Sequence, residues 1–330
     1  MVDVWEVLRA DAELAKWLTE MEALEGPEVD AALPAADELP AVLLDLAVPH
    51  EDVNPLVALW GEVAGDPVWS RLRELSVRGL MRDLGVPGGG VKVPLLPAEL
   101  GAAGRYFGVT VFLAMLPHVR AYHRALGIPA DTSRRTLADL GRNMAVCRRL
   151  TGRGGLLVPY WITLHFRGEL YQLGRLQFQL GTVRSAAAAS MAEAGRTERV
   201  GDPCLHLHIP DFSGPLAPGA CAGSLAAARE FFPRHYPAVG FRVAVCESWL
   251  LDPQLRDHLP AHSNIIGFQD LFARITPGDE DLDRTIVRFV YGDADTPFAE
   301  LPRRTSLERA VAGHLAAGRH WHGGAGWLAL

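Results

Sequence analysis

The sequence predicts an α+β fold, in which a helical N-terminal domain precedes a mixed α/β domain built on one central sheet. Three observations lead to this prediction. Apolar residues in roughly the first 150 positions recur at helical spacing, without a strand pattern. A glycine-rich break, Gly152-Arg153-Gly154-Gly155, then interrupts the chain. Beyond it, short β-rich segments alternate with helical ones. We therefore expect one domain at residues 1–152 and a second at residues 153–330.

Composition narrows the class of protein. With 330 residues, 49% of them hydrophobic, the chain can bury a sizeable core and has the length of two domains. A formal net charge of −7 argues against a partner such as nucleic acid. The longest apolar run, Phe107 to Leu116, is shorter than the roughly 20 residues that span a bilayer, and the acidic N-terminal segment does not resemble a signal peptide. We expect a cytoplasmic protein that does not insert into membranes.

The four cysteines give no sign of a metal site. Cys147, Cys204, Cys221 and Cys246 are far apart and form no Cys-x-x-Cys pair. This usage suits free thiols in a reducing compartment. A His-x-His pair at His206 and His208 could contribute to a zinc site, but no third ligand is evident, so we expect no metal.

The first domain is expected to be all helical. The predicted helices lie at residues 1–25, 42–46, 56–63, 106–125 and 136–150, with a further one opening at Asp66-Pro67. Gly88-Gly89-Gly90 is not a phosphate loop, because no Gly-Lys-Ser/Thr sequence follows it.

The second domain is expected to contain strands and helices in alternation. Residues 160–167 and 170–180 read as a hairpin that turns at Gly168-Glu169, and residues 185–199 read as a loop. Further strands are predicted at 205–209, 241–251 and 286–291, further helices after Pro218, Pro253 and Ser263 and at 306–317, and a loop or edge strand in the tail.

The segment from Cys204 to His235 is the part around which this domain is organised. Leu205, Leu207 and Ile209 alternate with His206 and His208. Pro210 ends this strand, and a turn leads to a helix that begins near Pro218. The first turn of a helix has unpaired N–H groups and the positive end of the dipole, so it could hold a pyrophosphate. An ordinary strand-to-helix connection remains the alternative.

Five segments carry a resemblance to a known family. They are RYFGVTVFLAMLPHVRAYH (105–123), WITLHFRGELYQLGRLQFQ (161–179), LHIP with the following GPL (207–216), CESWLLDPQL (246–255) and LPAHSNIIGFQ (259–269). Together they resemble a family of actinobacterial acyltransferase-domain proteins. These proteins combine a helical N-acyltransferase N-terminal domain with a GNAT-like C-terminal domain.

This resemblance implies an acyl-transfer site. In the GNAT fold a strand splays from its neighbour, the pantetheine of acyl-CoA lies in the gap, and the pyrophosphate sits on the next helix N-terminus. Here that implies donor contacts at Ile209, Gly214, Leu216 and Asn264. The usual Arg/Gln-x-x-Gly-x-Gly/Ala motif is absent from the loop Pro210–Leu216, which leaves acyl-CoA, an acyl carrier protein or no donor at all open.

Histidines and carboxylates are the candidates for catalysis. Transfer of an acyl group from a thioester to an amine needs a base, donors for the oxyanion and a proton for the leaving thiolate. His206 and His208 share one strand face, and His208, nearest the strand end, is the expected base. On the next strand Glu247 is a second candidate base and Ser248 a candidate proton donor. A structural or solvated role is the alternative for each of them.

Two arginines are candidates for phosphate binding. Arg167 and Arg175 could pair with a phosphate or a substrate carboxylate, but bridging to acids of the helical domain is the favoured interpretation.

The resulting hypothesis is an enzyme, a GNAT-like N-acyltransferase. It would move an acyl group from acyl-CoA or an acyl carrier protein to a small-molecule or peptide amine by direct attack. Two alternatives remain: a catalytically silent module that binds acyl-CoA or a carrier protein, and a scaffold that serves only assembly.

Overall fold

The computed structural model of the chain describes residues 3–26, 28–276 and 280–330. It divides into two compact units, one ending at Tyr171 and one beginning at Gln172. The expected boundary between residues 152 and 153 therefore falls inside the first unit. The reason is that the segment after Gly152 folds as a helix that packs on the other helices of the first unit.

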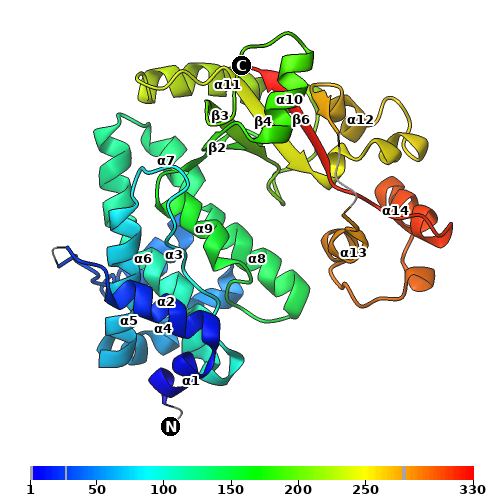
Figure 1. Cartoon of the computed structure of the whole chain (residues 1–330). Coiled ribbons are helices and arrows are strands. Elements are labelled where there is room, and N and C mark those ends of the chain that lie inside the picture. The colour runs from blue at the N-terminus through cyan, green and yellow to red at the C-terminus, as the bar shows by residue number, and fades with distance from the viewer. Residues whose placement is uncertain (1–2, 27, 277–279) are drawn as a thin grey trace. The chain divides into compact units, whose positions relative to one another are not determined.

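Up to residue 152 the described part of the first unit is helical, as predicted. Its helices are α1 (Val4–Ala10), α2 (Ala12–Glu22), α3 (Leu39–Asp45), α4 (His50–Gly65), α5 (Pro67–Arg82), the 3₁₀ turn η1 (Ala98–Leu100), α6 (Gly101–Ala125), α7 (Ala130–Leu137), α8 (Asp139–Thr151) and α9 (Pro159–Phe166) (Figure 1). The predicted start at Asp66-Pro67 is confirmed: the Asp66 side chain accepts from the N–H groups of Val68 and Trp69, and Pro67 is the first helical residue.

Helix α6 forms the centre of this unit. It packs against α4, α5 and α9, and Pro117 lies inside it. Residues 98–125 are long and apolar enough to cross a membrane by length and composition, but 78% of the most apolar window is buried inside the structure. Such burial is the environment of a core helix.

Helix α9 corrects the sequence prediction, since residues 160–167 were expected to form a strand. Pro159 occupies the first helical position, which suits its fixed backbone angle. The helix is held on α8 by His165, whose Nε2 lies 3.1 Å from Oδ2 of Asp139. Burial opposes the charge on Asp139, but His165 and Arg142 outweigh it and lower the pKa of this carboxyl.

The second unit is built on one six-stranded mixed sheet. Its elements are β1 (Leu170–Leu173), β2 (Leu176–Thr182), α10 (Ser185–Glu193), β3 (Pro203–His208), α11 (Pro218–His235), β4 (Val243–Ser248), η2 (Trp249–Leu251), η3 (Pro253–Asp257), α12 (Asn264–Gln269), β5 (Ala273–Ile275), α13 (Asp283–Tyr291), η4 (Phe298–Glu300), α14 (Ser306–Ala316) and β6 (Gly324–Ala329). The strand order is β1-β2-β3-β4-β6-β5, and within the described residues β3 and β4 form a parallel pair.

Helices cover both faces of this sheet (Figure 1). On one face Ala187 and Met191 of α10 pack with Val243 and Val245 of β4. On the other face α11 packs on β2, where Phe232 meets Phe178 edge to face. Since successive side chains of a strand point to opposite faces, His206 and His208 share the α10 face of the sheet with Val245 and Glu247.

Four further predictions in this unit were wrong. Residues 185–193 form helix α10 rather than a loop, and residues 286–291 belong to helix α13 rather than a strand. The hairpin is formed by β1 and β2 and turns at Gly174-Arg175, where Gly174 has a φ of 67°. The tail strand β6 lies between β4 and β5 instead of at the edge, because it pairs with both.

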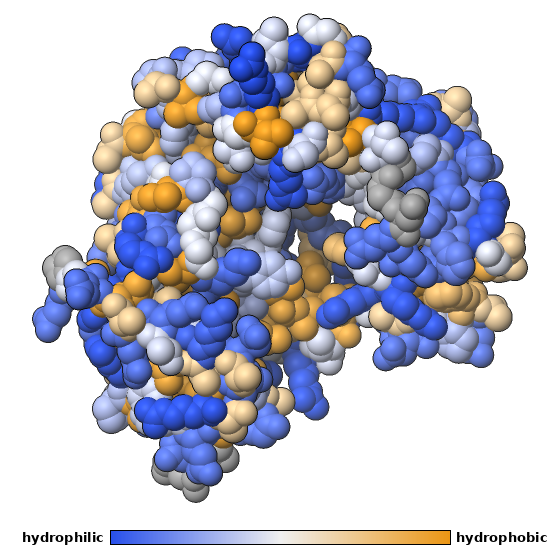
Figure 2. Space-filling view, in the orientation of Figure 1, coloured by the Kyte–Doolittle hydropathy of each residue, from blue (hydrophilic) through white to orange (hydrophobic). Residues whose placement is uncertain are grey.

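The surface mixes apolar and polar side chains. Figure 2 shows hydrophobic residues interspersed with hydrophilic ones on the face in view. Among the residues that the structure describes, the exposed large hydrophobic side chains are Leu44, Val57, Val86, Leu95, Tyr160, Val200, Phe212, Leu271 and Phe289. Among them, Phe212 lies in the loop that connects β3 to α11, next to the predicted site.

Candidate active site

The parallel strands β3 and β4 are paired over only part of their length. Their register joins Leu205 with Ala244 and His206 with Val245, and it ends there. Beyond this point β3 continues to pair with β2, and β4 continues to pair with β6. The carboxyl ends of the two strands therefore keep their outer neighbours but not each other. The opening between these strand ends is where a ligand could lie along the two backbones.

His208 is the last residue of β3, at the start of this opening. Its Nε2 donates to the amide oxygen of Gln179 on β2, at 2.9 Å. A neutral imidazole that donates from Nε2 carries its basic lone pair on Nδ1. His208 is half-buried. Gln179 thus orients the ring that the sequence singles out as the base, and sequence reasoning missed it because the contact depends on strand register.

His206 is half-buried, like His208, but it has different contacts. Its ring covers Gly181, where an added Cβ would lie 2.2 Å from Cδ2 of His206. Its Nε2 donates to the carbonyl of Thr182 at 3.3 Å. Burial, together with the charge of Arg184, lowers the pKa of His206. These contacts favour a structural role for His206 and leave His208 as the histidine nearer the opening.

Glu247 lies on the same face as the two histidines but in a solvated position. Its carboxylate pairs with Arg184 at 3.0 Å, and both side chains are more than half exposed. Ser248, the next residue, points to the opposite face by strand alternation. Its hydroxyl oxygen caps η2 by accepting from the N–H of Leu250. The structure therefore brings His208 and Glu247 to one face and separates Ser248 from them.

The loop after β3 leads directly into α11. Ile209 and Gly214 lie in this loop, Gly214 has a φ of 78°, and Leu216 is buried before the helix begins at Pro218. The first N–H groups of an α-helix have no intrahelical partner, and Pro218 has none to offer, so Gly219 and Ala220 present the first donors of α11. The strand, turn and helix N-terminus predicted from the sequence are all present.

Asn264 is the first residue of α12, the helix expected after Ser263. Ser263 is the N-cap, since its hydroxyl accepts from the N–H of Ile265. Asn264 is exposed.

The two arginines behave differently. Arg167 is buried and pairs with Glu169 and Asp83 of its own unit, as the favoured interpretation predicts. Arg175 instead donates to backbone carbonyls of the loop that follows β3. Its sequence position, in the turn between β1 and β2, gave no signal of this contact.

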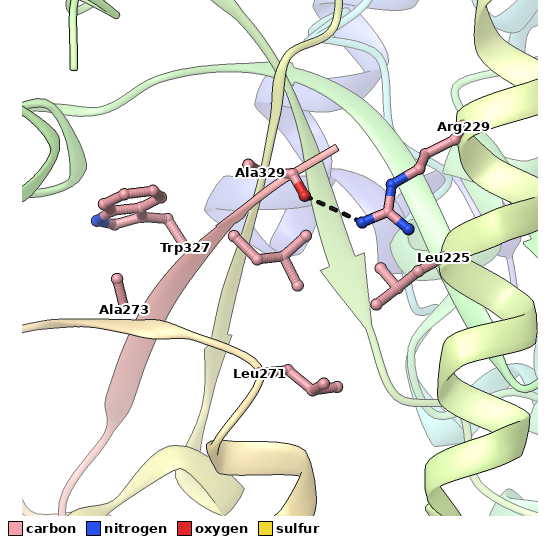
Figure 3. A pocket seen from close by; sticks show the side chains of 7 residues that line it. Leu225, Arg229, Leu271, Ala273, Trp327 and Ala329 are labelled. Carbon is pink, nitrogen blue, oxygen red and sulfur yellow. Dashed lines mark hydrogen bonds between the residues drawn. The ribbon is translucent and has the colours of Figure 1, made fainter.

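A pocket of about 300 Å³ lies beside β6. It is lined by residues of α11, β5 and β6 and by one residue of the segment before β5: Leu225, Arg229, Leu271, Ala273, Trp327, Leu328 and Ala329 (Figure 3). Arg229 reaches from α11 and donates to the carbonyl of Ala329, at 3.3 Å. Ala329 pairs with Val243 at the start of β4, so the Arg229 contact lies away from the carboxyl end where β3 and β4 separate.

A group of possible metal ligands occurs in the described part of the chain. Oxygen atoms of Asp281 and Asp283 and a ring nitrogen of His320 lie within 4.8 Å of one another. The His320 ring is already bonded to Asp283 at 2.7 Å, and this bond raises the pKa of His320. The geometry is that of a histidine–carboxylate pair.

Comparison with known families agrees with this geometry. Residues 37–168 match the N-acyltransferase N-terminal domain, and residues 170–328 match the GNAT-like C-terminal domain. No curated protein matches the chain.

Solved structures similar to this chain are acyltransferases with ligands bound. One is a crystal structure of an acyltransferase mutant with octanoyl-CoA, at 40% identity and a TM-score of 0.87, covering 99% of this chain and 100% of that one. Another is an acyltransferase with decanoyl-CoA and teicoplanin, at 40% identity and a TM-score of 0.87, and a third holds decanoyl-CoA, at 39% identity and a TM-score of 0.88. Both of these cover 100% of each chain.

This sequence identity extends over nearly all of each compared chain, and both domain families match, so the chain is homologous to these acyltransferases. The chain belongs to the acyltransferase family in which an N-acyltransferase N-terminal domain is joined to a GNAT-like C-terminal domain.

Proposed function

We propose that this acyltransferase moves a medium-length acyl chain from acyl-CoA to an amine of a teicoplanin-like acceptor by direct attack. Related structures hold octanoyl-CoA and decanoyl-CoA as ligands. One holds decanoyl-CoA with teicoplanin, and another holds CoA with 10C-teicoplanin. These two pairs have the composition expected before and after transfer of one decanoyl group, which supports both the donor and the acceptor class.

The observation that carries the proposal is the end of the β3–β4 pairing beside His208. The pantetheine arm would lie between the two strand ends, where β3 and β4 no longer pair with each other. The loop at Gly214 and Leu216, with the first N–H groups of α11, would hold the pyrophosphate. Asn264 would contact the same arm from α12.

The chemistry needs no covalent enzyme intermediate. The acceptor nitrogen attacks the thioester carbonyl carbon, and backbone N–H groups near Ile209 stabilise the oxyanion. His208 takes the proton that the nitrogen loses. The carbon–sulfur bond then breaks, the amide is released, and the CoA thiolate takes up a proton. The sequence suggests Ser248 as its donor, but Ser248 points to the opposite face of the sheet, so the protonated His208 is the nearer source of that proton.

Replacement of His208 by glutamine is the first test. The glutamine can still bond Gln179, but it cannot accept a proton, so we expect kcat for thiol release from decanoyl-CoA to fall about 100-fold. The assay measures free CoA thiol and the mass of the acylated acceptor, with teicoplanin as the amine.

Glu247→Gln and His206→Gln serve as controls. Glu247 is solvated and paired with Arg184, and His206 bonds the Thr182 carbonyl, so we expect each change to alter kcat by less than about fivefold. A His208→Gln enzyme with unchanged kcat would remove the proposed base. A larger loss in Glu247→Gln than in His208→Gln would assign the base to Glu247.

The same assay separates the other candidate functions. Binding of decanoyl-CoA without thiol release would select the silent binding module. Activity with an acyl carrier protein but not with CoA would change the donor. If the protein neither binds decanoyl-CoA nor releases thiol from it, the remaining hypothesis is a scaffold that serves only assembly. A cytoplasmic location is part of the proposal and is supported by four cysteines that form no disulfide.

A further inference from the structure

The loop between β3 and α11 is held by one side chain from another hairpin. Arg175, in the turn between β1 and β2, donates through Nε to the carbonyl of Gly214 at 2.8 Å and to that of Pro215 at 3.3 Å. Through Nη1 it donates to the carbonyl of Pro210 at 3.2 Å. The guanidinium therefore contacts both ends of the segment Pro210–Pro215, and its rigid fork suits several acceptors at once.

These contacts also set the direction of the loop's N–H groups. The peptide bonds of the described residues are trans, so a carbonyl and the N–H of the following residue point in opposite directions. Because the carbonyls of Pro210 and Pro215 point to Arg175, the N–H groups of Asp211 and Leu216 point away from it. The Leu216 donor then lies just ahead of the first donors of α11.

Arg175 is itself held firmly. Its backbone N–H donates to the Ser224 hydroxyl at 2.8 Å, and that of Leu176 donates to the same oxygen at 3.3 Å. Gly174 has a φ of 67°, and a Cβ there would lie 2.8 Å from the Ser224 hydroxyl. The turn that carries the arginine is thus fastened to the second turn of α11.

The loop has a conformation that its sequence alone would not favour. Phe212 has a φ of 55°, in the left-handed region that bulky residues rarely adopt, and its side chain is 56% exposed. Such backbone persists only where surrounding contacts impose it. The three carbonyl bonds of Arg175 supply contacts of that kind on either side of Phe212.

We propose that Arg175 is a positioning residue, which holds the segment Pro210–Pro215 in the shape that binds the pyrophosphate of acyl-CoA. It does for this chain what a glycine-rich phosphate motif does by its own backbone freedom. The inference rests on the proposed function, because it takes acyl-CoA as the donor.

The test compares Arg175→Ala and Arg175→Lys with the unchanged enzyme, using two donors. Decanoyl-CoA carries the pyrophosphate, whereas decanoyl-pantetheine carries the same thioester arm without it. We expect both variants to bind CoA about tenfold more weakly in calorimetry and to raise KM for decanoyl-CoA by a similar factor. KM for decanoyl-pantetheine and kcat with either donor should stay within about twofold.

Arg229→Ala is the matched control. Arg229 is another arginine of the second unit that donates to a backbone carbonyl, but it does so at the opposite end of β4. We expect the Arg229→Ala variant to bind CoA as tightly as the unchanged enzyme. Amide hydrogen exchange over residues 210–216 should be faster in both Arg175 variants than in Arg229→Ala, because the loop has lost its carbonyl contacts.

Several results would overturn the inference. If Arg175→Lys binds CoA as tightly as the unchanged enzyme and only Arg175→Ala binds it more weakly, the positive charge of Arg175 matters and its carbonyl contacts do not. Equal losses with both donors would mean that the variant disturbs the whole site. If the unchanged enzyme binds CoA but releases no thiol from decanoyl-CoA, the proposed function fails. The calorimetric comparison of CoA binding still decides the role of Arg175. If the unchanged enzyme binds no CoA, both fail.

Discussion

Two histidines of the second unit, side by side on one strand face, have different environments. The ring of His206 covers Gly181, whereas His208 reaches the end of β3 and is oriented by Gln179. The alternation of the sequence predicts that both share a face, and proximity to the strand end favours His208. The partner Gln179 could not be predicted, because it lies 29 residues earlier and meets His208 only through the register of β2 and β3.

A third histidine predicts acid sensitivity of the first unit. His123 is buried, its Nδ1 lies 2.7 Å from the Ser133 hydroxyl, and burial lowers its pKa to about 4. Its unfolded pKa is about 6.5, so between pH 6.5 and 4 the unfolded chain binds more protons than the folded one. The stability contributed by neutral His123 is complete above that window and is lost as the pH falls, by about 3 kcal/mol in total.

Replacement by asparagine removes this titration. Asparagine places a nitrogen or oxygen near the position of Nδ1 but does not ionise, so His123→Asn should be less stable than the unchanged protein at pH 7.5. The difference in free energy of unfolding should shrink as the pH is lowered to 5. Chemical denaturation at several pH values measures it, and a difference that is constant with pH would contradict the assignment.

Some secondary-structure elements could be predicted from the sequence and others could not. The amphipathic helices of the first unit and the strand at 203–208 were predictable from periodicity. Helix α9 was not, because it is buried on most sides and so shows no polar stripe. The run Ile286–Tyr291 is β-branched and aromatic, which favours a strand, but Ile286, Val287 and Val290 form one face of α13.

Helix α13 did carry one overlooked signal, the glycine at its end. Gly292 has a φ of 91° and caps the helix in the left-handed conformation. Gly292→Ala should therefore lower the free energy of unfolding by about 1 kcal/mol. Gly313 lies inside α14, where a Cβ would meet no atom within 4 Å, and Gly313→Ala should raise it by about 0.5–1 kcal/mol.

The two glycine variants control for each other in one denaturation experiment. Both change glycine to alanine in neighbouring helices of the second unit, so they differ mainly in backbone conformation. Destabilisation by both, or stabilisation by both, would contradict the φ angles described above.

For the whole molecule, the main expectation is stabilisation by the donor. A ligand that binds only the folded chain stabilises it by about 2.7 kcal/mol at a concentration of 100 times its Kd. We expect a saturable rise in Tm with decanoyl-CoA and a smaller one with acetyl-CoA, which has less apolar chain to bury. A Tm that does not respond to any CoA species would speak against a CoA donor.

The domain plan was largely predictable from the sequence, but its details were not. The change from helical periodicity to alternating strands placed the sheet in the second half of the chain, and the structure has it there. The position of the unit boundary depends on packing of α9, and the central position of β6 depends on which strands pair. Both are contacts between distant residues, on which local patterns give no information.

The place of β6 has a consequence for the order in which the second unit can fold. In the described sheet β5 is joined to β4 only through β6, and Ala273 pairs with Trp327. During synthesis, β5 emerges well before the strand that it needs, with α13 and α14 in between. β5 must therefore wait unpaired until β6 inserts beside β4. Pairing of β5 is therefore a contact between distant parts of the chain, and we expect it to form after the local helices.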